Sequence, residues 1–426
     1  MALKSQLCKG TIDIAVNSRF NLTFPLNSSE GDNVRLKEKK VLGLTIGSHS
    51  LVHFYEGVLP PLFPLLLAEF ATDYFHLGII VSIFSYAFGF GSLPAGLLAD
   101  KIGSRKLISI YLFGAGLLAV LVWPANTLWF YGTVMGLVGL FCAIYHPAAN
   151  TLLSLAMTDK GNAFGLHGVA GSLGVAMTPI LSAWIGTLLG WRTPHVIFGL
   201  MGILLGLYSL VIPEHRPPRN DSADKIDGVK LSHNQVTKIL IFFTASVFTG
   251  LTYKGIMTFL PAFMGEQVRL SFLPSDPVAL GGTVATIALL VGAAGQFASG
   301  RMVDRIRPEK LYLIAILIST ASVFAIATSA NLALIAATIV YAFFYFSIQP
   351  VQNFLITTYL PPHRRGFGFG LHFFLSFGVG ATAAPVCGYL ADTLGLASVF
   401  WAMGISFIIS AILSWMLLVQ SSRNTA

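Results

Sequence analysis

Twelve runs of apolar residues, separated by short polar stretches, follow one another along the chain from residue 41 onward. Each run is about as long as, or longer than, the roughly 20 residues that a helix needs to cross a bilayer, and none alternates strictly as a membrane-barrel strand does. Because backbone groups in hydrocarbon must be paired within their own segment, we expect helices. The predicted spans are residues 41–70, 75–99, 107–124, 128–156, 163–189, 194–212, 239–264, 278–299, 311–329, 332–360, 366–391 and 396–419.

Polar segments outside these runs set the predicted domain boundaries. Residues 1–40 are expected to form a cytoplasmic N-terminal tail, since they lack the apolar core of a signal peptide. Residues 213–238 form a polar linker with six runs on either side. This divides the chain into an N-terminal six-helix half, 41–212, and a C-terminal six-helix half, 239–420, followed by a short tail, 421–426.

The two halves repeat several residue patterns at a nearly constant spacing. The matching patterns are Phe164-Gly-Leu-His167 with Phe369-Gly-Leu-His372, Pro147-x-x-Asn150 with Pro350-x-x-Asn353, and Tyr55-Glu56-Gly57 with Tyr253-Lys254-Gly255. Such echoes indicate a duplicated unit with a site between its two copies. The predicted fold is an all-α membrane protein of twelve transmembrane helices in two pseudo-symmetric six-helix halves.

Composition agrees with a chain that lies mostly in lipid, since 55% of its residues are hydrophobic and only 10% are charged. Soluble domains carry about a quarter charged residues. The net charge of +8 would suggest nucleic acid for a soluble protein, but most bases here lie in loops on one side of the layout. We interpret them as topology determinants, which predicts cytoplasmic termini and linker in a plasma (bacterial inner) membrane, and no nucleic-acid partner.

Two charged loops occupy matching places in the halves. They read Gly96-Leu-Leu-Ala-Asp100-Lys-Ile-Gly-Ser104-Arg105-Lys106 and Gly300-Arg-Met-Val-Asp304-Arg305-Ile-Arg307-Pro-Glu-Lys310. An acid in such a loop can cap the next helix, whose first turn is electropositive, while the bases stay near lipid headgroups. The first loop resembles the motif between the second and third helices of the major facilitator superfamily. The second resembles the degenerate copy of that motif between helices eight and nine.

This resemblance implies two halves that rock about a midplane site, with charged loop residues that strengthen or loosen their contacts between the two states. The residues matched to this conformational switch are Asp100, Arg105, Lys106, Asp304, Arg305 and Arg307. Ser104 stands where the family usually has a base. We add His167 and His372 as gate or interface residues, because their duplication argues for a role in the fold.

Finer resemblances bear on the direction of transport. Gly174-Val-Ala-Met-Thr178-Pro179 resembles the fifth-helix motif of antiporters in this superfamily, with Thr178 where a glycine is usual. The pattern His49-x-x-x-His53, the prolines after it and Tyr145-His146-Pro147 resemble the fosmidomycin-resistance type of drug:proton antiporter. In that type an acid is more usual at His53, and many antiporters carry an arginine in the fourth helix that is missing here. The resemblance therefore implies efflux without the standard proton relay.

Ionisable residues inside the spans are the candidates for chemistry, because a charge within a membrane normally faces a cavity or a partner. His49, His53 and Glu56 share one face of the first helix. Lys254 stands in the seventh helix at the repeat position of Glu56. We hypothesise that Glu56 titrates the coupling proton, with Lys254 as its counter-ion or as the receiver of an anionic substrate. A purely structural ion pair is the alternative.

Further polar residues lie near the midpoints of the spans. Pro147 and Pro350 each free a backbone carbonyl and bend their helix next to a polar side chain. Interhelical hydrogen bonding explains these side chains about as well as substrate binding does. The predicted substrate-binding set is His49, His53, Tyr55, His146, Asn150, Tyr253, Gln349, Gln352 and Asn353.

A metal site is a further possibility that the sequence raises. His49, His53 and Glu56 have a spacing that metal ligands use on a helix, but helical histidines in cavity walls are more often hydrogen-bonded lining. We therefore assign no metal ligands and no cofactor, with the proton gradient as the driving force. The three cysteines show no metal spacing.

The predicted function is proton-coupled secondary active transport of a small organic solute by alternating access, in the direction of efflux by antiport. Uptake of an organic anion by symport and carriage of a metal or metallophore are alternatives, and a non-transporting membrane receptor or scaffold is an alternative of another class. The sequence contains no His-Glu-x-x-His, Gly-x-Ser-x-Gly or phosphate-binding motif, so we expect neither an enzyme nor direct ATP drive. The expected partners are the lipid bilayer and the solute, and the chain is expected to be a monomer.

Overall fold

Helices make up all regular structure in residues 29–214, 232–361 and 364–422, the part of the chain that this computed structural model describes. The first half contains α1 (Ser29–Gly57), η1 (Pro60–Leu62), α2 (Phe63–Phe70), α3 (Tyr74–Ile102), α4 (Ser104–Val120), α5 (Leu128–Cys142), α6 (Tyr145–Ala156), α7 (Lys160–Leu189) and α8 (Thr193–Leu210). The second half contains α9 (His233–Gln267), α10 (Pro277–Met302), α11 (Pro308–Thr328), α12 (Asn331–Tyr359), α13 (Arg365–Phe373), η3 (Phe374–Gly378), η4 (Val379–Thr382), α14 (Ala383–Leu394) and α15 (Ala397–Ser422).

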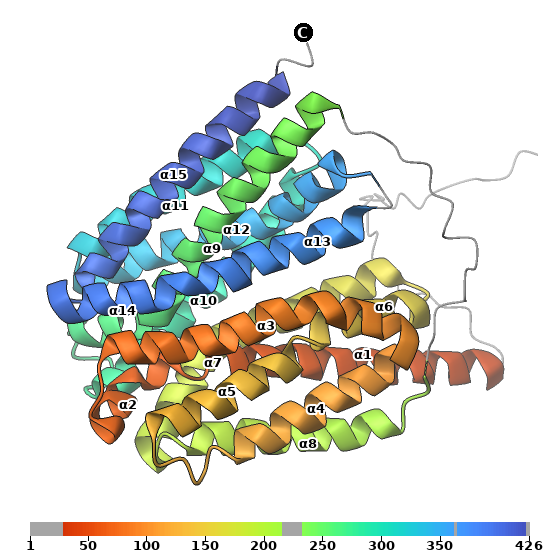
Figure 1. The fold of residues 1–426 in the computed structure, drawn as a ribbon, viewed down its shortest axis with the longest axis horizontal. Coiled ribbons are helices and arrows are strands. Elements are labelled where there is room, and N and C mark those ends of the chain that lie inside the picture. Colours follow the sequence, from red (N-terminus) through yellow and green to blue (C-terminus); the bar gives the residue numbers. More distant parts are fainter. Residues whose placement is uncertain (1–28, 215–231, 362–363, 423–426) are drawn as a thin grey trace, which may run out of the picture.

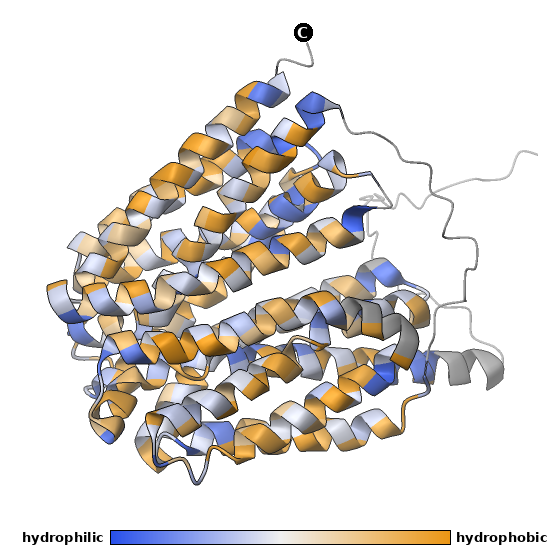
Figure 2. Ribbon diagram, in the orientation of Figure 1, coloured by the Kyte–Doolittle hydropathy of each residue, from blue (hydrophilic) through white to orange (hydrophobic). Residues whose placement is uncertain are grey.

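Every predicted span coincides with a helical segment. By length and composition, eleven segments of the described chain are long and apolar enough to cross a membrane. The twelfth is α4, whose 17 residues make it slightly shorter than the others. Large apolar side chains such as Leu188, Leu204 and Trp415 are exposed on outer helix faces, where lipid would cover them. Figure 2 shows apolar residues along the helices and most hydrophilic residues toward the helix ends. The twelve-helix fold is confirmed.

Three spans are broken rather than continuous. The first changes direction between α1 and α2, where Pro60 and Pro61 lack the N–H that would continue the helix. The fourth breaks between α5 and α6, just before Tyr145. The eleventh passes through a π-helical turn and a 3-10 turn, η3 and η4, between α13 and α14. Such turns commonly mark functional or strained places in a helix.

The helices extend beyond two of the predicted domain boundaries. α1 begins at Ser29, inside the segment that we assigned to a tail, and α9 begins at His233, inside the predicted linker. Ser232 starts α9 through a capping box, in which its hydroxyl accepts from Gln235 N and its own N–H donates to the Gln235 side chain. A boundary drawn from hydropathy follows the polarity of the residues and not their hydrogen bonds, so it does not mark where a helix begins. Residues 1–28, 215–231 and 423–426 lie outside the described residues.

The halves meet along two helix pairs, α3 with α14 and α7 with α10. We call the end of the bundle that carries Gly103 and Ser232 the linker end, and the opposite end the distal end. In Figure 1, α14 lies beside α3 toward the distal end, whereas α13 diverges from α3 toward the linker end. Glycines permit the close approach, since a Cβ at Gly78 would lie 2.5 Å from the carbonyl oxygen of Ala384.

The contact between the halves ends partway toward the linker end. Ser172 of α7 donates to the side chain of Gln296 in α10. One turn further on the same helix faces stand Gly168 and Gly300, and a Cβ at either position would have no described atom within 4 Å. The two helices are therefore packed at the distal end and separated at the linker end.

Candidate functional site

A cavity lies between the halves where the first, fifth, seventh and eighth spans meet. Its volume is about 70 Å³, and both halves contribute to its wall. The lining residues are His53, Glu56, Gly57, Pro60, Pro61, Val81, Val175, Thr178, Pro179, Tyr253, Lys254, Met257, Thr258, Pro261 and Leu289. Most are apolar or small, so the few polar groups are well placed to orient a solute.

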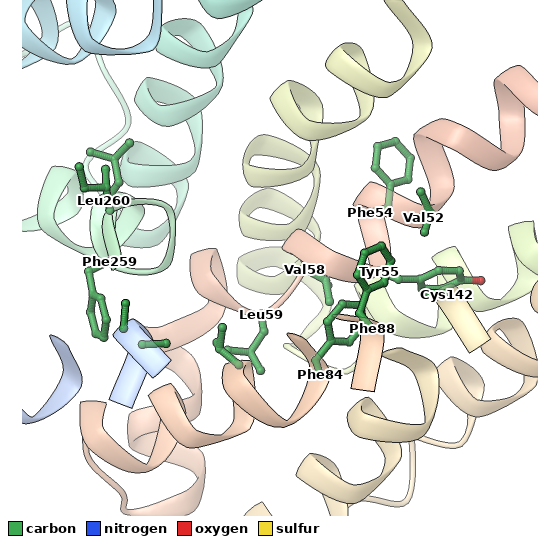
Figure 3. Close-up of a cluster of buried hydrophobic side chains, with 14 of the residues drawn as sticks. Val52, Phe54, Tyr55, Val58, Leu59, Phe84, Phe88, Cys142, Phe259 and Leu260 are labelled. Atoms are coloured by element: carbon green, nitrogen blue, oxygen red, sulfur yellow. The ribbon is translucent and has the colours of Figure 1, made fainter. Parts of the chain in front are cut away.

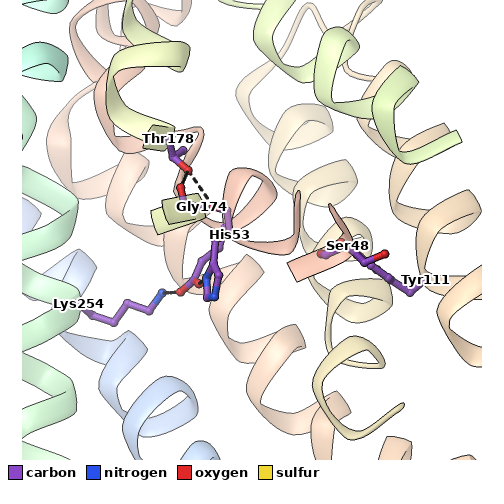
Figure 4. A network of polar contacts seen from close by, with 7 residues as sticks. Ser48, His53, Tyr111, Gly174, Thr178 and Lys254 are labelled. Atoms are coloured by element: carbon purple, nitrogen blue, oxygen red, sulfur yellow. Dashed lines mark hydrogen bonds and ion pairs between the residues drawn. The ribbon is translucent and has the colours of Figure 1, made fainter. Parts of the chain in front are cut away.

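An ion pair joins the two halves in this cavity. Lys254 Nζ of α9 lies 2.7 Å from Glu56 Oε1 of α1, and the two side chains are only 7% and 11% exposed. The other carboxylate oxygen of Glu56 lies 3.2 Å from His53 Nδ1. Figure 4 shows Lys254 extending from its helix toward His53. The Lys254 ammonium also lies 5.6 Å from the ring centre of Phe377 in η3. Removing Lys254 would leave the buried Glu56 with His53 alone, and removing Glu56 would leave the buried Lys254 ammonium without its opposite charge.

Close packing of α1 against α7 positions the acid and the histidines. Cβ atoms at Gly171 and Gly174 would collide with the His49 ring and with the Ser50 backbone, so only glycine fits at these positions. Ser50 donates to the carbonyl of Ala170 at 2.9 Å. Thr178, which replaces the usual glycine of the antiporter pattern, donates to the carbonyls of Gly174 and His53. These bonds hold α1 in the rotation that presents Glu56 to the cavity.

A cluster of histidines lies beside the ion pair. The His49 ring centre is 5.2 Å from those of His53 and His146, and 4.0 Å from that of His167, which stacks on it. His49 Nδ1 lies 2.6 Å from the His167 carbonyl oxygen, and His167 Nε2 lies 2.9 Å from the Tyr145 hydroxyl. His167, which we expected at a gate, thus stacks on His49, a member of the predicted substrate-binding set, and its role as a gate residue stays a prediction.

Of the predicted substrate-binding residues, only His53 and Tyr253 line the cavity, and two of the others are bonded inside their own half. Tyr55 donates to the carbonyl of Phe198 at 2.9 Å and lies within the N-terminal half, among the buried apolar side chains that Figure 3 draws around Phe84 and Phe88. Gln352 donates to the Tyr312 hydroxyl at 3.2 Å inside the C-terminal half. Their helices rotate these side chains toward neighbours of the same half, a choice that the repeat pattern does not reveal.

Two other residues of the predicted substrate-binding set, Tyr253 and Gln349, do lie near the contact between the halves. Tyr253 lines the cavity and stacks on Tyr345, with 5.4 Å between ring centres. Gln349 accepts a hydrogen bond from Gln296, which in turn accepts one from Ser172, so a polar chain crosses from α12 through α10 to α7. Sequence analysis missed Gln296 and Ser172. A glutamine inside an apolar run was the available signal for the first.

The repeat-related pair Asn150 and Asn353 have exposed side chains on α6 and α12. Exposure on these helices places both amides where solvent or lipid can reach them. Their assignment to substrate binding stays a prediction.

The first charged loop binds a residue that sequence analysis did not single out. Glu214, just after α8, accepts hydrogen bonds from the backbone N–H groups of Arg105 and Lys106 at 3.0 and 3.1 Å. Its carboxylate also lies 3.8 Å from Arg105 Nε. Glu214 thus caps α4, the role that we expected of the acid in the loop itself. The backbone of Asp100 lies in α3, and its side chain is outside the described residues.

The second charged loop makes similar contacts within the other half. Arg307 Nη1 donates to the Ser422 hydroxyl at 3.1 Å, while Asp304 and Arg305 are exposed. Glu309, a buried acid in the first turn of α11 that the sequence analysis passed over, accepts from the Tyr359 hydroxyl at 2.7 Å. The described contacts of the predicted switch residues are thus made within a half, and their role in switching stays a prediction.

One acid joins the halves at the distal end, and a second caps the same helix from its own half. The carboxylate of Asp392, at the end of α14, accepts from the backbone N–H groups of Tyr74 and Phe75 at 3.0 and 2.8 Å and so caps α3 from the opposite half. Asp73 accepts from the next N–H, that of His76. Burial raises the pKa of Asp73, but the hydrogen bonds from His76 outweigh it and hold this pKa below its ordinary value. Sequence analysis missed Asp392, since its partner lies in another span.

Comparisons with known proteins agree with this architecture. The chain is 24% identical over 371 residues to an uncharacterized MFS-type transporter of Methanocaldococcus jannaschii, covering 84% of this chain and 93% of the relative. It is 23% identical over 403 residues to a D-galactonate transporter of Escherichia coli, covering 84% and 89%. Among solved structures, a D-xylose-proton symporter superposes with a TM-score of 0.75 at 13% identity, covering 88% of this chain and 97% of the symporter.

The family assignment rests on most of the chain. The sequence model of the family described as the Major Facilitator Superfamily matches residues 45–385 and 276–426. Both relatives are named as transporters, which supports a secondary transporter here. The chain belongs to the Major Facilitator Superfamily.

Proposed function

We propose that this chain is a proton-coupled secondary active transporter that moves a small organic solute by alternating access. The observation that carries the proposal is the pair of Glu56 and Lys254, which joins α1 to α9 across the central cavity at 2.7 Å. A lone charge inside the membrane costs several kcal/mol, so neither partner can simply be exposed to the apolar interior when the halves move. Each state of the cycle must neutralise both groups.

A proton on Glu56 neutralises the acid, and Lys254 must then find its counter-charge elsewhere, for example in an anionic solute. The protonated acid no longer holds the Lys254 ammonium, and this removes one of the contacts between the halves in the cavity. His53 lies 3.2 Å from the same carboxyl group and is placed to exchange a proton with it. Protonation would therefore weaken one conformational state relative to the other, which is what coupling requires.

The charges at the two ends support a membrane orientation. Arg105, Lys106, Arg307 and Lys310 lie at the linker end, whereas the distal end carries acids that include Asp392. Under the positive-inside rule the linker end faces the cytoplasm, in a plasma (bacterial inner) membrane with both termini cytoplasmic. The separation of α7 from α10 at that end then corresponds to an inward-open arrangement.

Efflux by proton antiport is the direction that we propose. Its support is the resemblance to the fosmidomycin-resistance type of drug:proton antiporter, and the residues of that pattern, His49, His53, Tyr145 and His146, lie together beside the cavity. Conversely, uptake of an organic anion by symport is favoured by one observation, the buried Lys254 in the cavity wall. Two relatives are named for organic acids, D-galactonate and 3-(3-hydroxy-phenyl)propionate.

Flux into proteoliposomes would test the proposal. Candidate solutes, first selected by thermal shift, are labelled and followed with and without a pH gradient of either sign. We expect Glu56→Gln to lower gradient-driven flux at least tenfold while solute exchange without a gradient continues. Glu69→Gln is the matched control, because Glu69 is an ion-paired acid of α2 outside the cavity lining. Unchanged gradient-driven flux in Glu56→Gln would reject proton coupling through this residue. The sign of the effective gradient separates antiport from symport.

A further inference from the structure

Three histidines from two helices converge next to the cavity. His49 and His53 stand one turn apart on α1, and His146 comes from the start of α6. One ring nitrogen from each lies within 4.8 Å of those of the other two. The sequence had suggested Glu56 as the third member of this set. In the structure Glu56 pairs with Lys254, and His146 takes the third place.

The hydrogen bonds of two of these rings leave a nitrogen free for a ligand. His49 Nδ1 lies 2.6 Å from the backbone carbonyl of His167, and His53 Nδ1 lies 3.2 Å from the Glu56 carboxylate. Both oxygens are acceptors, so each Nδ1 carries the proton and the opposite nitrogen keeps its lone pair. Metal-binding histidines are usually oriented in this way, by a carbonyl or carboxylate on the other nitrogen.

Gly171 leaves space beside the His49 ring. A Cβ at Gly171 would lie only 2.5 Å from His49 Nε2, so the glycine leaves that edge of the ring uncovered by a side chain. Tetrahedral ligands at about 2.1 Å from an ion are separated by about 3.4 Å. The three nitrogens, all within 4.8 Å of one another, therefore need to close by at most about 1.4 Å, which rotations of the partly exposed His53 and His146 rings can supply.

We propose that His49, His53 and His146 form a binding site for a divalent transition-metal ion of the zinc, cobalt or nickel kind. Neutral imidazoles suit these ions, and three protein ligands leave a fourth position for water or a ligand from the cavity that His53 lines. The nearby charges of Glu56 and Lys254 cancel each other, so an anionic fourth ligand would be favoured. The site goes beyond the transport proposal and does not depend on the direction of transport.

A metal ion here would also act on the ion pair. Binding at the free nitrogen of His53 makes its Nδ1–H a stronger donor to Glu56. Glu56 would then be shared more strongly between His53 and Lys254, which lie on different halves. The bound ion is therefore expected to oppose release of the contact that joins α1 to α9.

Metal binding to the purified full-length chain in detergent, after treatment with a chelator, would test the site. We expect one zinc ion to bind per chain by calorimetry, and cobalt to give the visible absorption of a low-coordinate nitrogen site. His49→Gln and His146→Gln should each weaken zinc binding at least tenfold. His76→Gln, which changes an exposed histidine at the distal end, should leave it unchanged.

A second variant covers the case in which glutamine disturbs folding. His146→Cys supplies a thiolate in place of the imidazole, so its cobalt complex should gain a sulfur-to-metal charge-transfer band that the parent lacks. Failure of the parent chain to bind one equivalent would overturn the proposal. So would equal zinc affinity in the parent and both glutamine variants, or a cobalt spectrum that His146→Cys does not change.

Discussion

The centres of the two halves differ although their scaffolds repeat. In the N-terminal half, α1 and α6 present histidines to one another, with His49, His53 and His146 in mutual ring contact. In the C-terminal half, the equivalent region is aromatic, with Tyr253 stacked on Tyr345 and contacting Phe346. Duplication thus supplied the same helices twice, and the side chains facing the cavity then diverged.

The divergence is sharpest at the repeat-related pair Glu56 and Lys254. Two equal charges at these positions would repel across the cavity, whereas opposite charges form a pair with 2.7 Å between Nζ and Oε1. A symmetric scaffold with asymmetric charges therefore gives a contact that exists only between the halves. The C-terminal half provides the cation, and the N-terminal half provides the acid with its histidines.

The largest expected effect comes from removing one charge of this pair. Lys254→Met leaves Glu56 buried without a cation, which should lower the free energy of unfolding in micelles by about 3–5 kcal/mol. The double variant Glu56→Gln with Lys254→Met should recover most of that loss. For comparison, Arg192→Met, at the half-exposed pair with Glu69, should cost no more than about 1 kcal/mol. Similar losses of unfolding free energy in Lys254→Met and Arg192→Met would show that burial does not make the central ion pair more important for stability than the half-exposed one.

The next effect concerns the glycines that let α7 approach α1. Gly171→Ala places a methyl group 2.4 Å from the His49 ring, so we expect a loss of about 1–3 kcal/mol in unfolding free energy. Gly168→Ala, where no described atom lies within 4 Å, should be neutral or stabilising by up to about 1 kcal/mol through helix propensity. Equal behaviour of the two variants in denaturation would contradict the close packing at His49.

A smaller effect is expected at the distal contact between the halves. Asp392→Ala removes the cap that α14 provides for α3, at a cost of about 1 kcal/mol. Since 1.4 kcal/mol corresponds to about a tenfold change in an equilibrium, the distally open state should gain several-fold in population. Spin labels at Leu188→Cys and Phe272→Cys would report the distance between the halves. Thr393→Ala, whose hydroxyl bonds only within its own helix, is the control.

The smallest difference is expected between the duplicated histidines. His167 bonds the Tyr145 hydroxyl, whereas Nδ1 of the buried His372 has no hydrogen-bond partner among the described residues, and its ring stacks on Phe242. His167→Phe should therefore cost about 1 kcal/mol, while His372→Phe should be neutral or slightly stabilising. Melting midpoints of the two variants would check this. A large loss in His372→Phe would indicate a partner in another conformational state.

Sequence patterns determined the parts of this protein that depend on neighbours along the chain. Apolar run lengths gave the twelve spans, and the repeated patterns gave the duplication, because both are properties of one helix or of two related helices. The spacing of His49, His53 and Glu56 also placed them correctly on one face of α1. Each of these inferences needs only helical periodicity.

Tertiary structure alone decided which side chains meet. It rotated Tyr55 toward Phe198, gave the α4 cap to Glu214, capped α3 with Asp392 and brought His146 to the two histidines of α1. Helix rotation and partner choice are set by packing between residues that are far apart in sequence, with glycines allowing only certain approaches. One amino-acid sequence does not state directly which distant residues are in contact. The residues that make up the site could therefore be identified only from the packed helices.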